Sequence, residues 1–308
     1  MPDTASTGAA AHGLVPISRP DGTLAIVAMD QRNTLRRMLS AENMLTDDET
    51  IRSFNVDVLE ALSPAASALL LDPSFGVPAV QDANAMAPGC ATVVAVEPSE
   101  RDSWEGEPRA GRDPGRTAGR VLEMGGDAVK LLVHKRPDRS RRPGEPDLVA
   151  EVVDVVQAVV DDRAAAGVPS VIETLLYSFP DQDPLPLRRR GELIAESARI
   201  LSDTRPDLLK LEYPGDARGC QAVSDAVTVP SAMLSAGMPF DAFLDAVVTS
   251  CEEGGACGFI AGRVYWKEAV ALEGAARKQF LASAGRERLE RSVEAMSGRA
   301  RPWYETAA

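Results

Sequence analysis

Short, nearly continuous apolar runs alternate with longer amphipathic segments along most of the chain. Apolar runs of this kind are typical of parallel strands covered on both faces, whereas the longer segments repeat with a helical period. The expected strands are Leu24–Met29, Ala68–Asp72, Thr92–Val96, Ala128–Val133, Ser170–Glu173, Leu208–Glu212, Ala232–Ser235 and Gly258–Ala261. The clearest expected helices are Leu148–Ala166, Arg189–Leu201, Phe240–Glu253 and Val264–Ala282.

Eight strands, each followed by a helix or helical turn, predict a single (β/α)8 TIM barrel rather than an open doubly wound sheet. The first strand is not followed by a Gly-x-Gly-x-x-Gly motif, which disfavours a dinucleotide-binding domain. We expect one domain over residues 1–308, with a mobile N-terminal arm at 1–20. An extra C-terminal helix and tail are expected at 286–308.

Composition and charge narrow the possible partners. Hydrophobic residues make up 44% of the 308 residues, which excludes a disordered chain. The formal net charge of −13 disfavours nucleic acid as a partner, because phosphate backbones require a surplus of cations. No apolar run approaches the roughly 18 residues of a membrane span, and the N-terminus lacks the pattern of a signal peptide. We therefore expect a cytoplasmic protein without a membrane partner.

The rare residues bear on cofactors and on chemistry. Two histidines, and four cysteines without Cys-x-x-Cys spacing, disfavour a metal site, and no cofactor is expected. The chain has five lysines against 28 arginines. An arginine stays protonated and cannot act as a nucleophile, whereas the pKa of a lysine shifts on burial. Lysines retained in such a chain are therefore candidates for amine chemistry.

Four ionisable residues interrupt or end the apolar strands. Asp30 follows the first strand, Lys130 lies in the fourth, Glu173 ends the fifth and Lys210 lies in the sixth. Each could be part of a structural ion-pair network, but all four meet at the C-terminal rim, where barrel active sites lie. Two amines and two carboxylates in this position favour Schiff-base catalysis. A neighbouring ammonium and burial would lower the pKa of the reacting lysine, and Glu173 could move protons.

The last two strands end in small residues, in the position where many barrels bind phosphate. Ser235-Ala236-Gly237 closes the seventh strand, and Gly262-Arg263 closes the eighth. Small side chains let backbone N–H groups approach an anion, and the Arg263 guanidinium could hold it with two hydrogen bonds. Two polar loops, at 97–119 and 134–147, are expected at the same rim, and the second carries a lysine and four arginines.

With these residues in place, the chain resembles the tagatose 1,6-bisphosphate aldolase family of class I aldolases, which is related to the sulfofructose 1-phosphate aldolases. The resemblance covers nearly the whole chain. The segments that carry it are Asp30-Gln31-Arg32, Leu62-Ser63-Pro64-Ala65-Ala66-Ser67, Val129-Lys130-Leu131-Leu132, Lys210-Leu211-Glu212-Tyr213-Pro214, Leu234-Ser235-Ala236-Gly237 and Gly258-Phe259-Ile260-Ala261-Gly262-Arg263-Val264-Tyr265-Trp266.

The resemblance implies a role for each candidate residue. Lys210 would form the Schiff base and Glu173 would transfer protons beside it. The residues that would contact substrate hydroxyls or the C1 phosphate end are Asp30, Gln31 and Lys130. The residues that would hold a phosphate are Ser235, Gly237, Gly262 and Arg263. The implied reaction is the reversible cleavage of a ketose phosphate between C3 and C4, giving dihydroxyacetone phosphate and a three-carbon aldehyde.

The two branches of the family differ in that aldehyde. Leu70–Ala79 and Pro302-Trp303 are similar to the tagatose branch, which yields glyceraldehyde 3-phosphate. The segment Leu131–Arg136 is more similar to the sulfosugar branch, which yields sulfolactaldehyde. Two other classes stay open: a non-catalytic sugar-phosphate sensor, and an isomerase or epimerase with Glu173 as base. The amphipathic outer helices permit a dimer or tetramer, and we expect a homo-oligomer.

Overall fold

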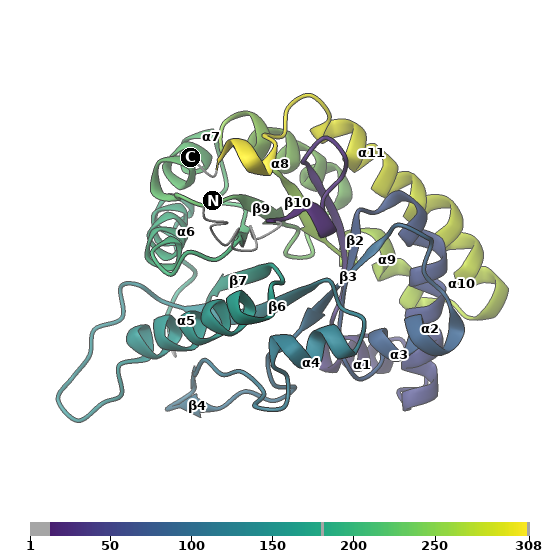
Figure 1. Ribbon diagram of the computed structural model, residues 1–308, viewed down its shortest axis with the longest axis horizontal. Helices are drawn as coiled ribbons and strands as arrows, with labels where there is room; N and C mark the ends of the chain where they lie inside the picture. The colour runs from purple at the N-terminus through teal and green to yellow at the C-terminus, as the bar shows by residue number, and fades with distance from the viewer. Residues whose placement is uncertain (1–12, 180–181, 307–308) are drawn as a thin grey trace, which may run out of the picture.

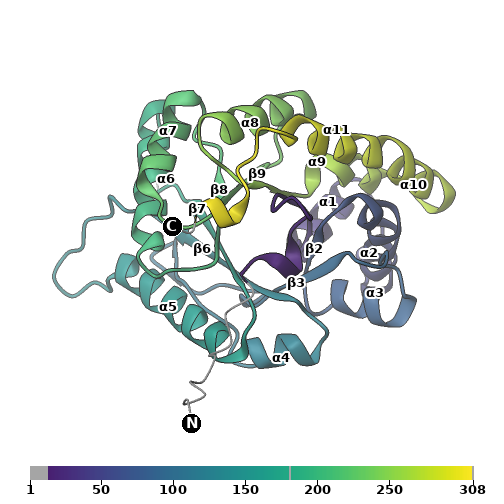
Figure 2. The same cartoon turned by 45° about the horizontal axis from the view of Figure 1, so that its top comes forward.

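The computed structural model describes residues 13–179 and 182–306, and its main sheet closes into a parallel barrel (Figure 1). The strand order is β1-β10-β9-β8-β7-β6-β3-β2, and β1 pairs with both β2 and β10. Helices surround this closed barrel, which confirms the predicted (β/α)8 fold (Figure 2). The barrel strands are β1 Leu24–Met29, β2 Ala68–Leu71, β3 Ala91–Ala95, β6 Ala128–Lys135, β7 Ser170–Leu176, β8 Leu208–Glu212, β9 Ser231–Leu234 and β10 Gly258–Ala261.

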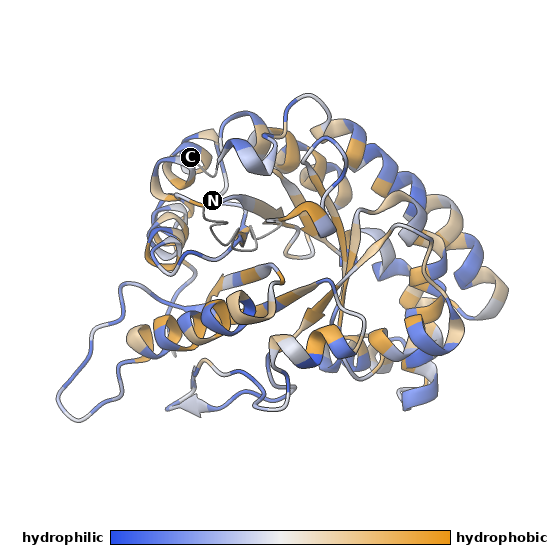
Figure 3. Ribbon diagram, in the orientation of Figure 1, coloured by the Kyte–Doolittle hydropathy of each residue, from blue (hydrophilic) through white to orange (hydrophobic). Residues whose placement is uncertain are grey.

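The strands are apolar on both faces because each face packs against a different core. In β1, Leu24, Ile26 and Ala28 belong to the core that fills the barrel. The alternate residues Val27 and Met29 belong to the core between the strands and the helices. The strands are accordingly apolar along their length in Figure 3, whereas each helix has one apolar and one polar side.

Four of the α-helices begin after a residue whose side chain accepts a hydrogen bond from a backbone N–H of the first turn. Asp47, Asp147 and Asp216 each accept a hydrogen bond from the backbone of the first turn. Within the described residues, no helix is long and apolar enough to cross a membrane. The α-helices are α1 Asn33–Ala41, α2 Asp48–Leu62, α3 Gly76–Ala83, α4 Ala118–Glu123, α5 Leu148–Ala166, α6 Leu187–Ser202, α7 Ala217–Ala226, α8 Phe240–Glu252, α9 Arg263–Trp266, α10 Gly274–Phe280 and α11 Arg286–Met296.

The structure corrects two predicted segments. The expected helix Val264–Ala282 is divided, because Leu272 is extended and Gly274 has a left-handed φ of +50° between a 3₁₀ turn and α10. From Gly274 the chain stays helical through a π-turn into α11, the predicted C-terminal helix. Strand β6 continues to Lys135, so His134 and Lys135 belong to the barrel and not to the loop after it.

The described part of the predicted N-terminal arm, residues 13–20, packs against the core. Residues 1–12, which include His12, lie outside the described residues. Within 13–20, however, Leu14 and Ile17 are buried in the core that fills the barrel, and Trp303 packs against that core. The backbone N–H of Trp303 also donates to Gly22. Residues 13–20 are therefore part of the packed barrel rather than a mobile arm.

The polar segment at 97–119 contains a small antiparallel ribbon outside the barrel. Its strands are β4 Ser103–Trp104 and β5 Glu107–Pro108, and β4 is labelled near α5 in Figure 1. The arginines that follow bind α5: Arg109 contacts Glu151 at 2.8 Å and Arg112 contacts Asp162 at 2.6 Å. This segment is therefore anchored to the outside of the barrel by ion pairs.

Candidate active site

Five charged side chains form one layer inside the barrel, above its apolar filling. In each case the residue two positions earlier in the chain is an apolar member of the inner core. Because side chains alternate along a strand, that spacing turns the charged residue inward as well. The five residues are Asp30, Glu97, Lys130, Glu173 and Lys210. The structure therefore brings the four predicted ionisable residues together and adds Glu97, which follows β3.

Lys130 lies at the centre of this layer and contacts three carboxylates. Its Nζ lies 2.7 Å from Asp30 Oδ2, 2.7 Å from Glu97 Oε1 and 2.9 Å from Glu173 Oε2. The lysine side chain is fully buried, and all three acids are less than a tenth exposed. Glu97 is also held from the backbone, because Leu132 N–H donates to its Oε2.

Lys210 has a different environment. Its Nζ lies 3.0 Å from Glu173 Oε2, and this is the one ion pair of Lys210 within the described part of the chain. Glu173 and Lys210 are direct register partners on β7 and β8, so the pairing follows from strand alignment. Glu173 thus lies between the two lysines, which are on strands two apart.

Electrostatic interactions keep Lys130 protonated and keep the carboxyl groups of Asp30 and Glu173 ionised. Burial opposes the charge on Lys130, but Asp30, Glu173 and Glu97 outweigh it and raise the lysine's pKa well above its ordinary value. Burial would raise the pKa of Asp30, but Lys130 and Lys210 lower it to about 2. The same two lysines outweigh burial at Glu173 and lower its pKa. Lys130 therefore stays an ammonium group and cannot be the nucleophilic amine.

A cavity of about 270 Å³ opens directly above Lys210 and Glu173. The site residues that line it besides these two are Gln31, Ser235, Gly262 and Arg263. Gln31 Nε2 donates to Asp30 Oδ1 at 2.9 Å, which leaves Asp30 held by Gln31 and Lys130 together. Lys130 does not line the cavity. It lies beneath the cavity, against the three carboxylates, and its contact with substrate stays a prediction.

The ends of β9 and β10 approach this cavity through unusual backbone. Ala236 and Gly237 both have left-handed φ values, +47° and +77°, in a turn closed by Met238 N–H donating to Ser235 O. A Cβ atom on Gly262 would lie 2.0 Å from Ala28 O, so only glycine fits beside β1. Gly237 lines a neighbouring hollow rather than the lysine cavity. Arg263 lines both, and a Cβ atom on Gly237 would lie 3.2 Å from its guanidinium carbon.

A second and larger cavity, of about 730 Å³, adjoins the first and shares Gln31, His134, Glu173 and Arg263 with it. Three further arginines line the larger cavity: Arg32, Arg37 and Arg101. The sequence had suggested the cations of 134–147 for such a position. The structure places them elsewhere: Arg136 pairs with Asp138, Arg139 with Glu107, and Lys135 faces away from the barrel interior.

Sequence reasoning therefore missed Glu97, His134 and the arginines of the larger cavity. The signal for Glu97 was available, because it ends an apolar run just as Asp30 does. Arg32 belongs to the Asp30-Gln31-Arg32 segment of the resemblance, but nothing in the sequence distinguished Arg37 and Arg101 from the other arginines. Within the described residues, no group of three or more His, Cys, Asp or Glu side chains is placed to hold a metal ion.

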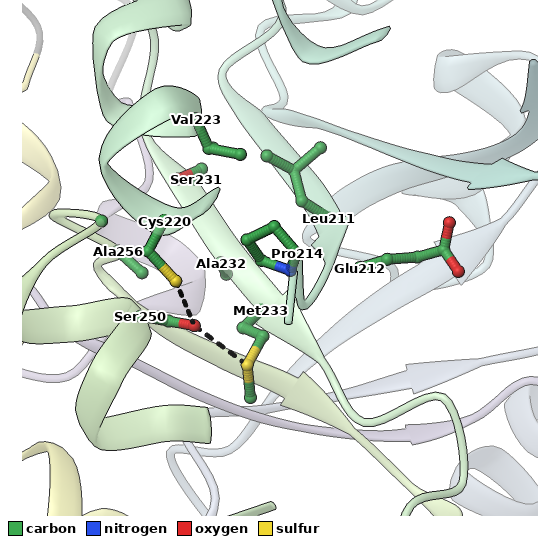
Figure 4. A pocket seen from close by; sticks show the side chains of 11 residues that line it. Leu211, Glu212, Pro214, Cys220, Val223, Ser231, Ala232, Met233, Ser250 and Ala256 are labelled. Atoms are coloured by element: carbon green, nitrogen blue, oxygen red, sulfur yellow. Dashed lines mark hydrogen bonds between the residues drawn. The ribbon is translucent and has the colours of Figure 1, made fainter. Parts of the chain in front are cut away.

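A separate small apolar pocket lies outside the barrel, between β8, β9, α7 and α8 (Figure 4). Ser250 Oγ contacts Cys220 Sγ at 3.9 Å and donates to Met233 Sδ at 3.1 Å there. The carboxylate of Glu212 points away from these side chains. The space is about 20 Å³, too small for a substrate, and we interpret it as a packing gap.

Comparison with known proteins identifies the family. A model of the DeoC/LacD family aldolases matches residues 24–268, which confirms the predicted relationship. The chain is 26% identical to tagatose 1,6-diphosphate aldolase of Listeria monocytogenes serotype 4a, over 95% of this chain and 93% of that protein. It is 27% identical to tagatose 1,6-diphosphate aldolase of Streptococcus agalactiae serotype V, over 94% and 96%. A crystal structure of an archaeal fructose 1,6-bisphosphate aldolase shares the fold, with a TM-score of 0.57 and 18% identity, covering 90% of this chain and 97% of that chain.

Proposed function

The chain belongs to the DeoC/LacD family of aldolases, which are carbon–carbon lyases, and from this premise we propose that it cleaves a ketose bisphosphate through a Schiff base on Lys210. The observation that carries the proposal is the pairing of Lys210 with Glu173 alone, at 3.0 Å, on the wall of the cavity. Lys130, by contrast, is enclosed by three carboxylates and stays charged.

The proposed reaction starts at the Lys210 amine. Lys210 Nζ attacks the C2 carbonyl of the ketose, and the resulting carbinolamine loses water to give an iminium ion. The C3–C4 bond then breaks: its electrons pass to the iminium as an enamine, and the C4 hydroxyl loses its proton to become the aldehyde. Protonation at C3 and hydrolysis release dihydroxyacetone phosphate. Glu173, the carboxylate that lies against Lys210 Nζ, would carry the protons for carbinolamine formation and dehydration.

The C1 phosphate would bind at the ends of β9 and β10. Ser235, Gly262 and Arg263 line the cavity there, and Gly237 lies against the Arg263 guanidinium. Asp30 and Gln31, which hydrogen-bond to each other, lie beside the same space and would contact substrate hydroxyls. Lys130 would act beneath them by keeping Asp30 and Glu173 ionised.

The distal anion of the substrate would lie in the larger cavity, against Arg32, Arg37 and Arg101. The relatives named tagatose 1,6-diphosphate aldolase support a second phosphate, so that glyceraldehyde 3-phosphate would be the aldehyde product. The alternative is sulfofructose 1-phosphate, which would give sulfolactaldehyde. Arginine side chains could bind the tetrahedral sulfonate in the same cavity. Comparing kcat/KM for tagatose 1,6-bisphosphate with kcat/KM for sulfofructose 1-phosphate distinguishes these two substrates.

The decisive experiment is incubation with dihydroxyacetone phosphate and sodium borohydride, followed by intact-protein mass spectrometry and peptide mapping. We expect a single reduced adduct on Lys210 and none in Lys210→Met. The control is the same variant's circular dichroism, which should match that of the unmodified protein. If wild type binds the phosphate ester without forming an adduct, an isomerase or a sugar-phosphate sensor explains the site instead.

Two broader expectations belong to this proposal. A metabolic aldolase of this family would work in the cytoplasm, and its outer helices would support a homo-oligomer. Sedimentation equilibrium of the purified protein measures the second directly, and a monomer at working concentrations would contradict it.

A further inference from the structure

His134 occupies the boundary between the two cavities. It is one of five residues that line both, together with Gln31, Glu173, Leu175 and Arg263. On β6 it follows Lys130 and Leu132 at alternate positions, so all three turn toward the barrel interior. Leu132 is the register partner of Glu173, and Glu173 is that of Lys210. His134 therefore lies nearer the barrel mouth than Lys210.

Four of the five acids that line the cavities have partners, and the fifth, Glu100, is exposed and lines the larger cavity alone. Asp30 accepts from Gln31 and Lys130, and Glu97 accepts from Lys130 and the Leu132 backbone. Glu212 accepts from Arg190 and the Leu176 backbone, while Glu173 is shared by the two lysines. His134 differs, because its Nδ1 has no hydrogen-bond partner among the described residues. It is thus a proton-accepting group with no ion pair, next to the site.

The environment keeps this imidazole neutral. Burial, and next the positive charge of Arg101, lower the pKa of His134 to about 4. Lys130 acts in the same direction, and Glu173 opposes both. An anionic substrate group bound at Arg101 would offset that arginine's repulsion and raise the pKa of His134 toward neutrality. Substrate binding would therefore make His134 a better base at the moment it is needed.

Resting on the proposed function, we propose that His134 is a further catalytic residue, which accepts the proton of the C4 hydroxyl as the C3–C4 bond breaks. The electrons of the broken bond pass to the Lys210 iminium, the O–H electrons form the aldehyde carbonyl, and the proton passes to the imidazole. In the condensation direction the imidazolium returns that proton to the aldehyde oxygen. C4 lies two bonds from the C2 atom held by Lys210, on the side of the substrate that would extend toward the larger cavity, and His134 lines both cavities.

This role separates two half-reactions that can be measured independently. Exchange of the C3 hydrogen of dihydroxyacetone phosphate with D2O requires the Schiff base and the enamine but no C4 oxygen. Cleavage of tagatose 1,6-bisphosphate requires the Schiff base and the enamine, and it also requires removal of the proton from the C4 oxygen. A residue that acts only at the C4 oxygen affects cleavage alone, whereas a residue that merely supports the barrel affects both.

The test compares His134→Gln with wild type and with Lys135→Met, a matched control on the same strand but on its other face. In His134→Gln we expect cleavage to fall by about 100-fold or more, because an amide cannot take up the proton. Hydrogen exchange and borohydride trapping on Lys210 should stay within about twofold of wild type. Lys135→Met should match wild type in all three measurements.

His134→Ala offers a second readout, because the adjoining cavity leaves room for a free base. We expect added imidazole to restore part of the cleavage activity of His134→Ala. It should restore no cleavage activity in Lys210→Met. Equal losses of cleavage and exchange in both His134 variants, or unchanged cleavage, would overturn the role of His134 while leaving the Schiff base intact. If wild type shows neither trapping nor exchange, the proposed function itself fails, and the role of His134 with it.

Discussion

Lys210 Nζ lies 3.0 Å from Glu173 Oε2, and Lys130 Nζ lies 2.9 Å from the same oxygen. One carboxylate oxygen thus connects two amines with different surroundings. Lys130 has two more carboxylate partners and no contact with the cavity, whereas Lys210 faces the cavity with this partner alone. The arrangement keeps Lys130 as a permanent charge and leaves Lys210 as the amine that we propose to react.

Glu173→Gln should separate imine formation from turnover. The amide cannot carry protons, so we expect turnover to fall by about 10²- to 10⁴-fold while borohydride still traps dihydroxyacetone phosphate on Lys210. Glu107→Gln is the matched control, because that acid binds Arg139 and Tyr177 outside the two cavities. Complete loss of trapping in Glu173→Gln would instead assign Glu173 to substrate binding.

Lys130→Met should be strongly destabilising, because it leaves Asp30, Glu97 and Glu173 buried without their shared cation. We expect the free energy of unfolding at pH 7 to fall by about 3–5 kcal/mol, measured by urea denaturation. Without the lysine, burial raises the folded-state pKa values of Asp30 and Glu173 above their unfolded values. The variant's deficit should therefore shrink between pH 7 and pH 5 as the acids take up protons. A deficit that is the same at both pH values would count against this electrostatic account.

Lys135→Met should stabilise the protein at neutral pH. Lys135 is 1% exposed, and burial lowers its pKa to about 8, so the folded state resists the charged form. This folded-state pKa lies below the unfolded one, so the penalty is complete below pH 8 and disappears as pH rises toward 10.5. We expect a gain of about 1–3 kcal/mol at pH 7 that is lost near pH 10.5, followed through Tm. A gain independent of pH would point to packing instead.

Arg263→Ala should weaken the binding of phosphorylated substrates. Arg263 lines both cavities and contacts Gly237 at the end of β9, where the C1 phosphate is proposed to bind. Loss of a charge-assisted contact should raise KM by about 10- to 100-fold, with a smaller effect on kcat. Steady-state kinetics across a range of substrate concentrations measure both. A change confined to kcat would argue against a ground-state phosphate contact.

Arg37→Ala should affect only substrates that carry a distal anion. Because Arg37 lines the larger cavity alone, we expect KM for tagatose 1,6-bisphosphate to rise about tenfold, with KM for tagatose 1-phosphate unchanged. Arg141→Ala is the matched control, since Arg141 donates to the backbone of Glu145 in the loop after β6. If Arg141→Ala produces the selective effect and Arg37→Ala does not, the distal anion lies against that loop.

Local patterns in the sequence are enough to predict the barrel and to single out four candidate ionisable residues. Apolar runs with strand spacing and amphipathic segments with helical spacing are local patterns, and they fixed the barrel and most element boundaries. A charged residue within an apolar strand is equally local, because its burial cost is visible without knowing its neighbours. Asp30, Lys130, Glu173 and Lys210 were found in this way.

Which carboxylates pair with Lys130 and which with Lys210 depends on the tertiary structure. Lys130 and Asp30 are 100 positions apart, and Lys130 and Glu97 are 33 apart, so their contacts exist only once the barrel has closed in its particular register. The strand register places Glu173 beside Lys210, and the closed barrel brings Asp30 and Glu97 into contact with Lys130. The larger cavity likewise brings Arg32 and Arg37, from the start of α1, together with Arg101 from the segment after β3. Exposed arginines have no burial cost that marks them in a sequence, and their function depends on where the chain places them.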